Sequence, residues 1–134
     1  MKWIDFERQM KQKDIKLFTP LDVRRFLGRS KVAVTFLLHR LKKQGYIETV
    51  KRGLYKFSGQ EIPDVYIANK LYEPSYISLE FALSYHGVIP ETVYEITSVT
   101  PKTTRRFETL GKVYSYRRIK KSAFTAQFLV LKVR

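Results

Sequence analysis

The fold of this chain is decided by residues 18–57, which read FTPLDVRRFLGRSKVAVTFLLHRLKKQGYIETVKRGLYKF. Thr19 followed by Pro20 is a typical helix start, because the hydroxyl can accept a hydrogen bond from a free backbone N–H and proline fits the first turn. From Val23 onward, apolar residues follow the i, i+3, i+4 spacing of one helix face, and Gly28 can adopt the positive φ that ends a helix. The sequence therefore predicts a short helix followed by a tight turn.

A second helix is predicted from Lys31 to Gln44, with Ser30 as its N-cap. At 100° per residue, its inward positions fall within about a third of the circumference. These inward positions are Val34, Leu37, Leu38 and Leu41. The opposite arc holds Val32, Phe36, His39 and Lys43, with Lys31, Thr35 and Arg40 towards its flanks. The major groove of DNA suits this mixture, since cations contact phosphates, polar groups contact base edges and apolar groups contact thymine methyls.

A hairpin with a basic tip is predicted after Gly45, which ends the second helix. Two β-prone runs, Ile47–Val50 and Leu54–Phe57, are joined by Lys51-Arg52-Gly53. Two short helices followed by a hairpin are the pattern of a winged helix-turn-helix. Cations at such a tip can contact a phosphate strand or a minor groove.

The candidate DNA-binding residues divide by expected role. Base edges are expected to be contacted by Lys31, Thr35 and His39. Ser30, the N-cap of the same helix, is also expected to be a DNA-binding residue. Phosphates are expected to be contacted by Arg29, Lys43, Lys51 and Arg52.

The same pattern has a second interpretation. Two amphipathic helices joined by a short turn also occur in bundles that bind no DNA, and a basic outer face is often simply solvated. The basic hairpin favours DNA binding over this alternative. Phe36 is expected to pack under the hairpin or against the first helix, and His39 is expected to be a surface residue and not a pH switch.

Composition indicates a folded and strongly basic protein. Hydrophobic residues make up 44% of the 134 positions, including 9 Tyr, 9 Phe and 1 Trp, which indicates folded cores. The 26 Lys and Arg residues exceed the 12 Asp and Glu residues, giving a formal net charge of +14. Residues 1–60 hold 15 basic and 5 acidic residues, whereas residues 61–134 hold 11 and 7. Because the charge is concentrated around the predicted motif, nucleic acid is a more suitable partner than an anionic membrane.

Signals for secretion, membrane insertion and catalysis are missing from the sequence. It has no Cys, no apolar run at its start and no stretch that approaches the ~20 apolar residues of a membrane span. It also lacks metal-spaced His or acidic clusters, a phosphate-binding glycine loop and a nucleophile elbow. We therefore expect a cytoplasmic protein that is not an enzyme and has no catalytic residues, metal or cofactor.

The remaining N-terminal elements complete a first domain. A helix is expected from Trp3 to Gln12, and a strand over Ile15–Phe18 is expected to pair beside the hairpin. Turn-prone residues at 58–63 indicate a domain boundary. The sequence thus predicts a DNA-binding domain at 1–60 and a second domain at 61–134.

The second domain is predicted to be α+β, with two helices on one side of a small antiparallel sheet. Its first helix runs from Asp64 to Leu71, and the expected stripe is Val65, Ala68, Asn69 and Tyr72. Its second helix is capped by Ser78, and the expected face is Leu79, Ala82, Leu83 and His86. The expected strands are Tyr94–Thr100, Arg105–Thr109, Lys112–Ile119 and Phe124–Val133.

The strands at 105–121 are basic and contain Tyr114 and Tyr116. Three interpretations of these strands are open. One hypothesis is an RNA-binding module in which these tyrosines stack on unpaired bases. A solvated strand face is an alternative, because solvent-facing strand positions are normally polar. A third interpretation is a protein-docking domain without nucleic-acid specificity. The sequence does not decide the oligomeric state.

Five segments of the chain are typical of one known family. They are KRGLY at 51–55, ANKL at 68–71, PSYISLEFAL at 74–83, HGVIPE at 86–91 and ITSVT at 96–100. In these segments the chain resembles the type IV abortive-infection antitoxin family, the AbiEi-like transcriptional regulators. The run at 74–100 is the most specific part, because many regulators share a winged domain. The resemblance extends from Phe18 to about Phe124.

The resemblance implies a bacterial antitoxin that binds the double-stranded operator DNA of its own operon through the winged domain. It also implies that the second domain contributes to neutralising a partner toxin that resembles nucleotidyltransferases. Proteins of this family usually continue beyond the basic strands, whereas this sequence ends at Arg134. The resemblance is thus compatible with a regulator only, or with a C-terminally truncated product.

Overall fold

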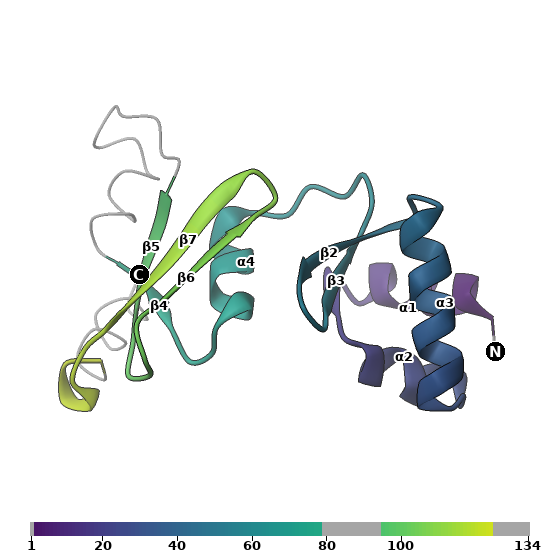
Figure 1. The fold of residues 1–134 in the computed structure, drawn as a ribbon, viewed down its shortest axis with the longest axis horizontal. Helices are drawn as coiled ribbons and strands as arrows, with labels where there is room; N and C mark the ends of the chain where they lie inside the picture. Colours follow the sequence, from purple (N-terminus) through teal and green to yellow (C-terminus); the bar gives the residue numbers. More distant parts are fainter. Residues whose placement is uncertain (1, 79–94, 125–134) are drawn as a thin grey trace. The chain divides into compact units, whose positions relative to one another are not determined.

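The computed structural model describes residues 2–78 and 95–124. They form two compact units, Met1–Ile62 and Pro63–Arg134, which are coloured along the chain in Figure 1. Both units combine helices with a sheet, so the α+β class is confirmed. The separate functions expected for the two parts of the chain stay a prediction.

Three helices and a three-stranded antiparallel sheet make up the first unit (Figure 1). Its elements are α1 (Trp3–Gln12), β1 (Leu17–Phe18), α2 (Pro20–Leu27), α3 (Lys31–Lys43), β2 (Ile47–Lys51) and β3 (Leu54–Phe57). The strand order is β1-β3-β2, so β1 pairs beside the β2-β3 hairpin as predicted. Two details differ from the prediction: β1 is shorter than 15–18, and Lys51 ends β2 instead of lying in the hairpin loop.

The boundaries of α2 and α3 follow from their capping residues. The Thr19 hydroxyl accepts a hydrogen bond from the Asp22 N–H at 3.2 Å, and the Asp22 carboxylate accepts one from the Thr19 N–H at 2.8 Å. Gly28 ends α2 with φ +67°, a left-handed conformation that glycine adopts without strain. The Ser30 hydroxyl accepts a hydrogen bond from the Ala33 N–H at 3.2 Å and so starts α3. These caps fix the short turn between the two helices.

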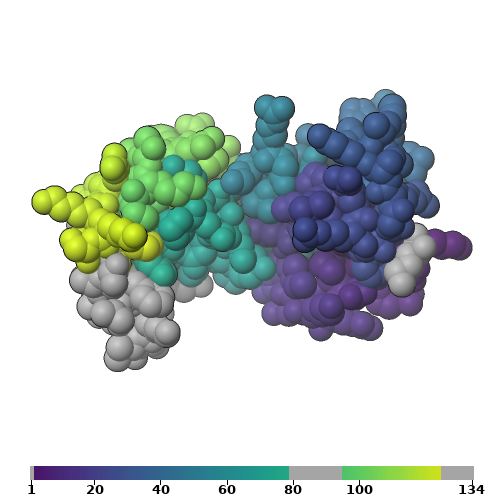
Figure 2. All heavy atoms as spheres, turned by 90° about the horizontal axis from the view of Figure 1, so that it is seen from below, coloured from purple at the N-terminus to yellow at the C-terminus, as the bar shows by residue number. Residues whose placement is uncertain are grey.

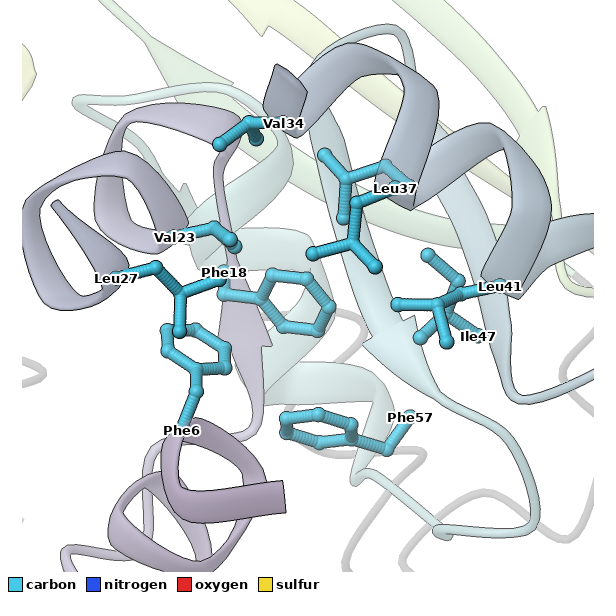
Figure 3. Packing of buried hydrophobic residues seen from close by; sticks show 10 residues of the cluster. Phe6, Phe18, Val23, Leu27, Val34, Leu37, Leu41, Ile47 and Phe57 are labelled. Carbon is cyan, nitrogen blue, oxygen red and sulfur yellow. The ribbon is translucent and has the colours of Figure 1, made fainter. Parts of the chain in front are cut away.

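The core of the first unit lies between its three helices and its sheet, and Figure 3 shows side chains of all six elements converging there. Phe18 is at the centre, with ring centroids 5.4 Å from Phe6 and 4.8 Å from Phe57. Aromatic contacts of this kind contribute about 0.5–1.5 kcal/mol per pair beyond the buried area. The predicted inward residues of α3 are all buried, and they are Val34, Leu37, Leu38 and Leu41. The buried side of α3 therefore determines which side faces outward.

The second unit contains a mixed sheet in place of the antiparallel sheet that the sequence predicts. Its elements are α4 (Asp64–Leu71), β4 (Tyr76–Ile77), β5 (Glu95–Thr100), β6 (Arg105–Thr109) and β7 (Lys112–Arg118). The strand order is β4-β5-β7-β6, and β5 and β7 are parallel, whereas the other neighbours are antiparallel. The antiparallel prediction is wrong at this pair because β7 turns back between β5 and β6.

The β6-β7 hairpin turns at Leu110-Gly111, where φ is 53° and 75°. Positive φ at both central residues is characteristic of the tight turns that match the twist of two antiparallel strands. The conformation suits Gly111, whereas the Cβ of Leu110 makes it unfavourable there.

Other predictions for the second half also need correction. The buried residues of α4 are Ile67, Ala68 and Leu71, whereas the predicted stripe contained the exposed Asn69. Residues 121–124 are helical, so Phe124 does not begin a strand. The helix predicted after Ser78 and the strand residues predicted beyond Phe124 lie outside the described residues.

Candidate nucleic-acid interface

The outward face of α3 is exposed to solvent. Val32 and Phe36 are 65% and 72% exposed, and His39, Arg40 and Lys43 on the same side of the helix are exposed as well. In the space-filling view, the blue side chains of this region lie at the surface of the first unit (Figure 2). The expectation that Phe36 packs under the hairpin or against the first helix is wrong, because the helix turns this residue about 150° away from its buried side at 100° per residue.

The start of α3 brings together three of the predicted residues, Arg29, Ser30 and Lys31, all of which are exposed. Because the Ser30 oxygen accepts a hydrogen bond from the backbone of α3, its own hydroxyl hydrogen remains able to donate. The first N–H groups of a 13-residue helix carry a partial positive charge at this end. Two cations, a hydroxyl and a helix N-terminus together form a favourable position for a phosphate group.

Thr35 is exposed, but its hydroxyl already makes a hydrogen bond within α3. It donates to the carbonyl of Lys31 at 2.8 Å. In this conformation the Thr35 oxygen can only accept further hydrogen bonds. The donors on base edges in a major groove are the amino groups of adenine and cytosine. In a major groove, the Thr35 hydroxyl in this conformation could therefore form a hydrogen bond with adenine or cytosine only.

No acidic residue interrupts the sequence around α3. Between Val23 and Ile47 there are 7 Lys and Arg residues and no Asp or Glu. Within residues 2–78 and 95–124, none of the described ion pairs involves Arg29, Lys31, Arg40, Lys42 or Lys43. The positive field of α3 therefore acts outward, where it attracts polyanions in a salt-dependent manner.

The β2-β3 hairpin adds a second cationic element. Arg52 and Gly53 form its tip, Arg52 is exposed, and Lys51 at the end of β2 is partly exposed. Further down the hairpin, the Lys56 amino group lies 2.6 Å from a Glu48 carboxylate oxygen. Glu48 is the only acidic residue of this hairpin, so the pair neutralises its charge and the tip remains cationic.

Several cations of the second unit have partners within their own unit. The Lys112 amino group donates to both carboxylate oxygens of Asp64 at 2.7 Å, which joins β7 to the start of α4. Arg105 lies over the Phe107 ring with its guanidinium carbon 4.9 Å from the centroid. These contacts use positive charge to stabilise the unit itself.

Tyr114 and Tyr116 are buried, at 1% exposure each. Burial raises the pKa of both phenols, and the carboxylate of Asp64 raises the pKa of Tyr114 further. The Tyr116 hydroxyl donates to the carbonyl of Ala68 and so attaches β7 to α4. Because neither ring is accessible, neither can stack on an unpaired base. The RNA-binding hypothesis thereby loses the two aromatic contacts on which it depended.

An open hollow of about 330 Å³ lies between α1 and α2. It is lined by Met10, Ile15, Asp22, Arg25 and Phe26, of which Asp22 already caps α2. Across the described part of the chain, no group of three or more His, Asp or Glu side chains could hold a metal ion. No helix in the same residues is long and apolar enough to cross a membrane.

The exposed face of α3, its acid-free surroundings and the basic hairpin all belong to one continuous segment. Residues 11–57 match the family model of AbiEi antitoxins, described as transcriptional regulators. The resemblance found in the sequence is thus confirmed for this segment, which contains all of α2, α3, β2 and β3. The AbiEi match supports a transcriptional regulator of the antitoxin kind as the general function. No curated protein matches the chain.

Proposed function

We propose that the first unit is a winged helix-turn-helix and that the chain is a cytoplasmic, DNA-binding transcriptional regulator that represses its own operon. The observation that carries the proposal is the exposed, acid-free outer face of α3 beside a hairpin with a cationic tip. The AbiEi match supports it, because the matched residues include both elements.

In this proposal α3 enters the major groove and the hairpin contacts the adjacent backbone. Lys31, Thr35 and His39 contact base edges, with Thr35 accepting from an amino group. The phosphate contacts are made by Arg29, Ser30, Lys43, Lys51 and Arg52. The contacts with phosphate supply most of the affinity, and the contacts with bases supply sequence preference.

The test is fluorescence anisotropy with a labelled duplex taken from the region upstream of the gene, compared with a scrambled duplex of the same length. The proposal predicts a preference for the upstream duplex. Arg52→Ala should weaken binding to both duplexes and lower the salt slope by about one unit. Arg117→Ala removes a cation of β7 that is also exposed and serves as the matched control, which should bind like the unaltered protein. Equal affinity for the two duplexes would overturn the proposal.

We further propose that the second unit contributes to neutralising a toxin that resembles nucleotidyltransferases. The support is the sequence resemblance over residues 74–100 together with the AbiEi match in the first unit. Co-expression with the product of the adjacent reading frame should restore growth that this product alone inhibits. A variant with weakened DNA binding, such as Lys31→Gln with Arg52→Gln, should still restore growth if the neutralising activity lies in the second unit. Failure of the unaltered chain to restore growth would contradict this part.

A further inference from the structure

Two apolar side chains stand in the middle of the cationic face of α3. Val32 and Phe36 have the largest exposed fractions, 65% and 72%, among the large exposed hydrophobic residues of the described chain. They lie four positions apart on one side of the helix, which places them about 6 Å apart along its axis. Exposed apolar groups that are adjacent on a rigid helix indicate a contact surface more strongly than scattered ones.

The charges around Val32 and Phe36 identify the kind of partner. Lys43 lies on the same exposed face and Lys31 on its flank, and the stretch from Val23 to Ile47 has no carboxylate. A second copy of this chain would bring the same cations face to face and would be repelled. A polyanion with apolar groups within reach is the complementary partner. The edges of DNA bases carry one such group in the major groove, the C5-methyl of thymine.

We infer that Val32 and Phe36 contact thymine methyl groups, and that they are specificity-determining residues for a DNA site with thymines in adjacent positions of the major groove. The inference rests on the proposed DNA-binding function and adds the base groups that determine which DNA sequence is bound. Because Thr35 lies on a flank of the same face and can accept from an adenine amino group, a thymine–adenine pair would offer contacts to both residue types.

The test begins with selection of bound sequences from a randomised pool of 20-base-pair duplexes, using the 134-residue chain. The most enriched duplex is then synthesised in two forms, one with thymine and one with deoxyuridine, which lacks only the C5-methyl group. Binding to the deoxyuridine duplex should be weaker by about fourfold for each methyl contacted, and so by roughly fifteenfold when two are lost.

Two variants connect this loss to the proposed residues. The double variant Val32→Ala, Phe36→Ala should bind the two duplexes with equal affinity, while its salt slope stays unchanged because the cations are intact. Phe36→Leu should retain the preference for thymine, since leucine still presents an apolar surface. Ile4→Ala removes an exposed apolar side chain of α1 and is the matched control, which should discriminate as strongly as the unaltered protein.

The remaining outcomes distinguish failure of this inference from failure of the proposed function. If the pool yields no enriched sequence, both the proposed function and this inference are overturned. If a sequence is enriched but lacks thymine, or if deoxyuridine does not weaken binding, only this inference is overturned. It is also overturned if deoxyuridine weakens the double variant as much as the unaltered protein, because the methyl groups would then be read elsewhere.

Discussion

Both units carry many cations, but their two basic surfaces differ in what surrounds the charge. On α3 the surrounding sequence has no carboxylate, and the exposed apolar side chains between the cations are Val32 and Phe36. On β6 and β7 a carboxylate or an aromatic ring accompanies cations such as Lys112 and Arg105, and the tyrosines are buried. Net charge alone therefore does not identify a binding surface. The neighbours of each charge determine whether it stabilises the fold or attracts a partner.

The largest effect is expected from Phe18→Ala, which should destabilise the first unit and leave the second unit folded. Phe18 is 1% exposed and touches the rings of Phe6 and Phe57. Its loss should lower the free energy of unfolding of the first unit by about 3–5 kcal/mol. The single tryptophan, Trp3, packs against this core, so its fluorescence reports the change.

DNA binding should weaken in the Phe18→Ala variant in parallel with the unfolding of the first unit. The amide signals of the second unit in a two-dimensional NMR spectrum should remain at their positions. Loss of both sets of signals together would show that the units do not fold independently, and the comparison between them would then have no basis.

The second largest effect is expected when equal charge is removed from the two surfaces. Arg29→Gln with Lys43→Gln should weaken DNA binding by about a hundredfold at 0.1 M salt, at about tenfold per phosphate contact, and lower the salt slope by about two. Arg117→Gln with Arg118→Gln removes the same charge from β7 and should change neither quantity. Anisotropy titrations at several salt concentrations measure both. An equal loss in the two variants would mean that net charge governs binding.

A smaller effect is expected from Asp64→Asn in the second unit. Lys112 would lose the carboxylate that it contacts at 2.7 Å, and the free energy of unfolding should fall by about 1 kcal/mol because both side chains are partly exposed. Urea unfolding followed by circular dichroism, in a double-mutant cycle with Lys112→Met, isolates the interaction. Affinity for DNA should stay the same, and a clear loss of affinity would place this pair in the interface.

The smallest effect at neutral pH is expected from the two buried tyrosines. Their folded pKa values are raised above the ordinary value of 10.0, so the folded state keeps protons that the unfolded state releases. This contribution to stability is complete below pH 10 and is lost progressively as the pH rises above it. Urea unfolding from about pH 9 to about pH 11.5 should show a steeper loss in the unaltered protein than in a Tyr114→Phe, Tyr116→Phe variant. If the two proteins lose stability equally over this pH range, the tyrosines do not have raised pKa values in the folded state.

The first unit was largely predictable because its signals are local. The caps at Thr19 and Ser30 and the glycine at Gly28 define two helices, and the apolar spacing of α3 is clear over 13 residues. The side of α3 that faces outward follows from the same spacing. The exposure of Phe36 was not predicted, because whether a large apolar side chain finds a neighbour depends on elements distant in sequence.

The second unit was less predictable because its arrangement depends on non-local pairing. The short connection at 101–104 suggests adjacent antiparallel strands, yet β7 separates β5 from β6. α4 has only eight residues and is apolar on several sides, so its sequence does not determine which side is buried. β4 is two residues long, too short to give an alternating pattern. The burial of Tyr114 and Tyr116 follows from these pairings and could not be read from the strand alone.

The turn at Leu110-Gly111 offers a route to a more robust protein for experimental work. Leu110 is an exposed leucine in a left-handed conformation, where asparagine or glycine is preferred. Leu110→Asn should relieve roughly 1 kcal/mol of backbone strain and remove an apolar group from the surface. Engineering at this one position would give a background with greater thermal tolerance, in which destabilising substitutions elsewhere remain soluble enough to assay.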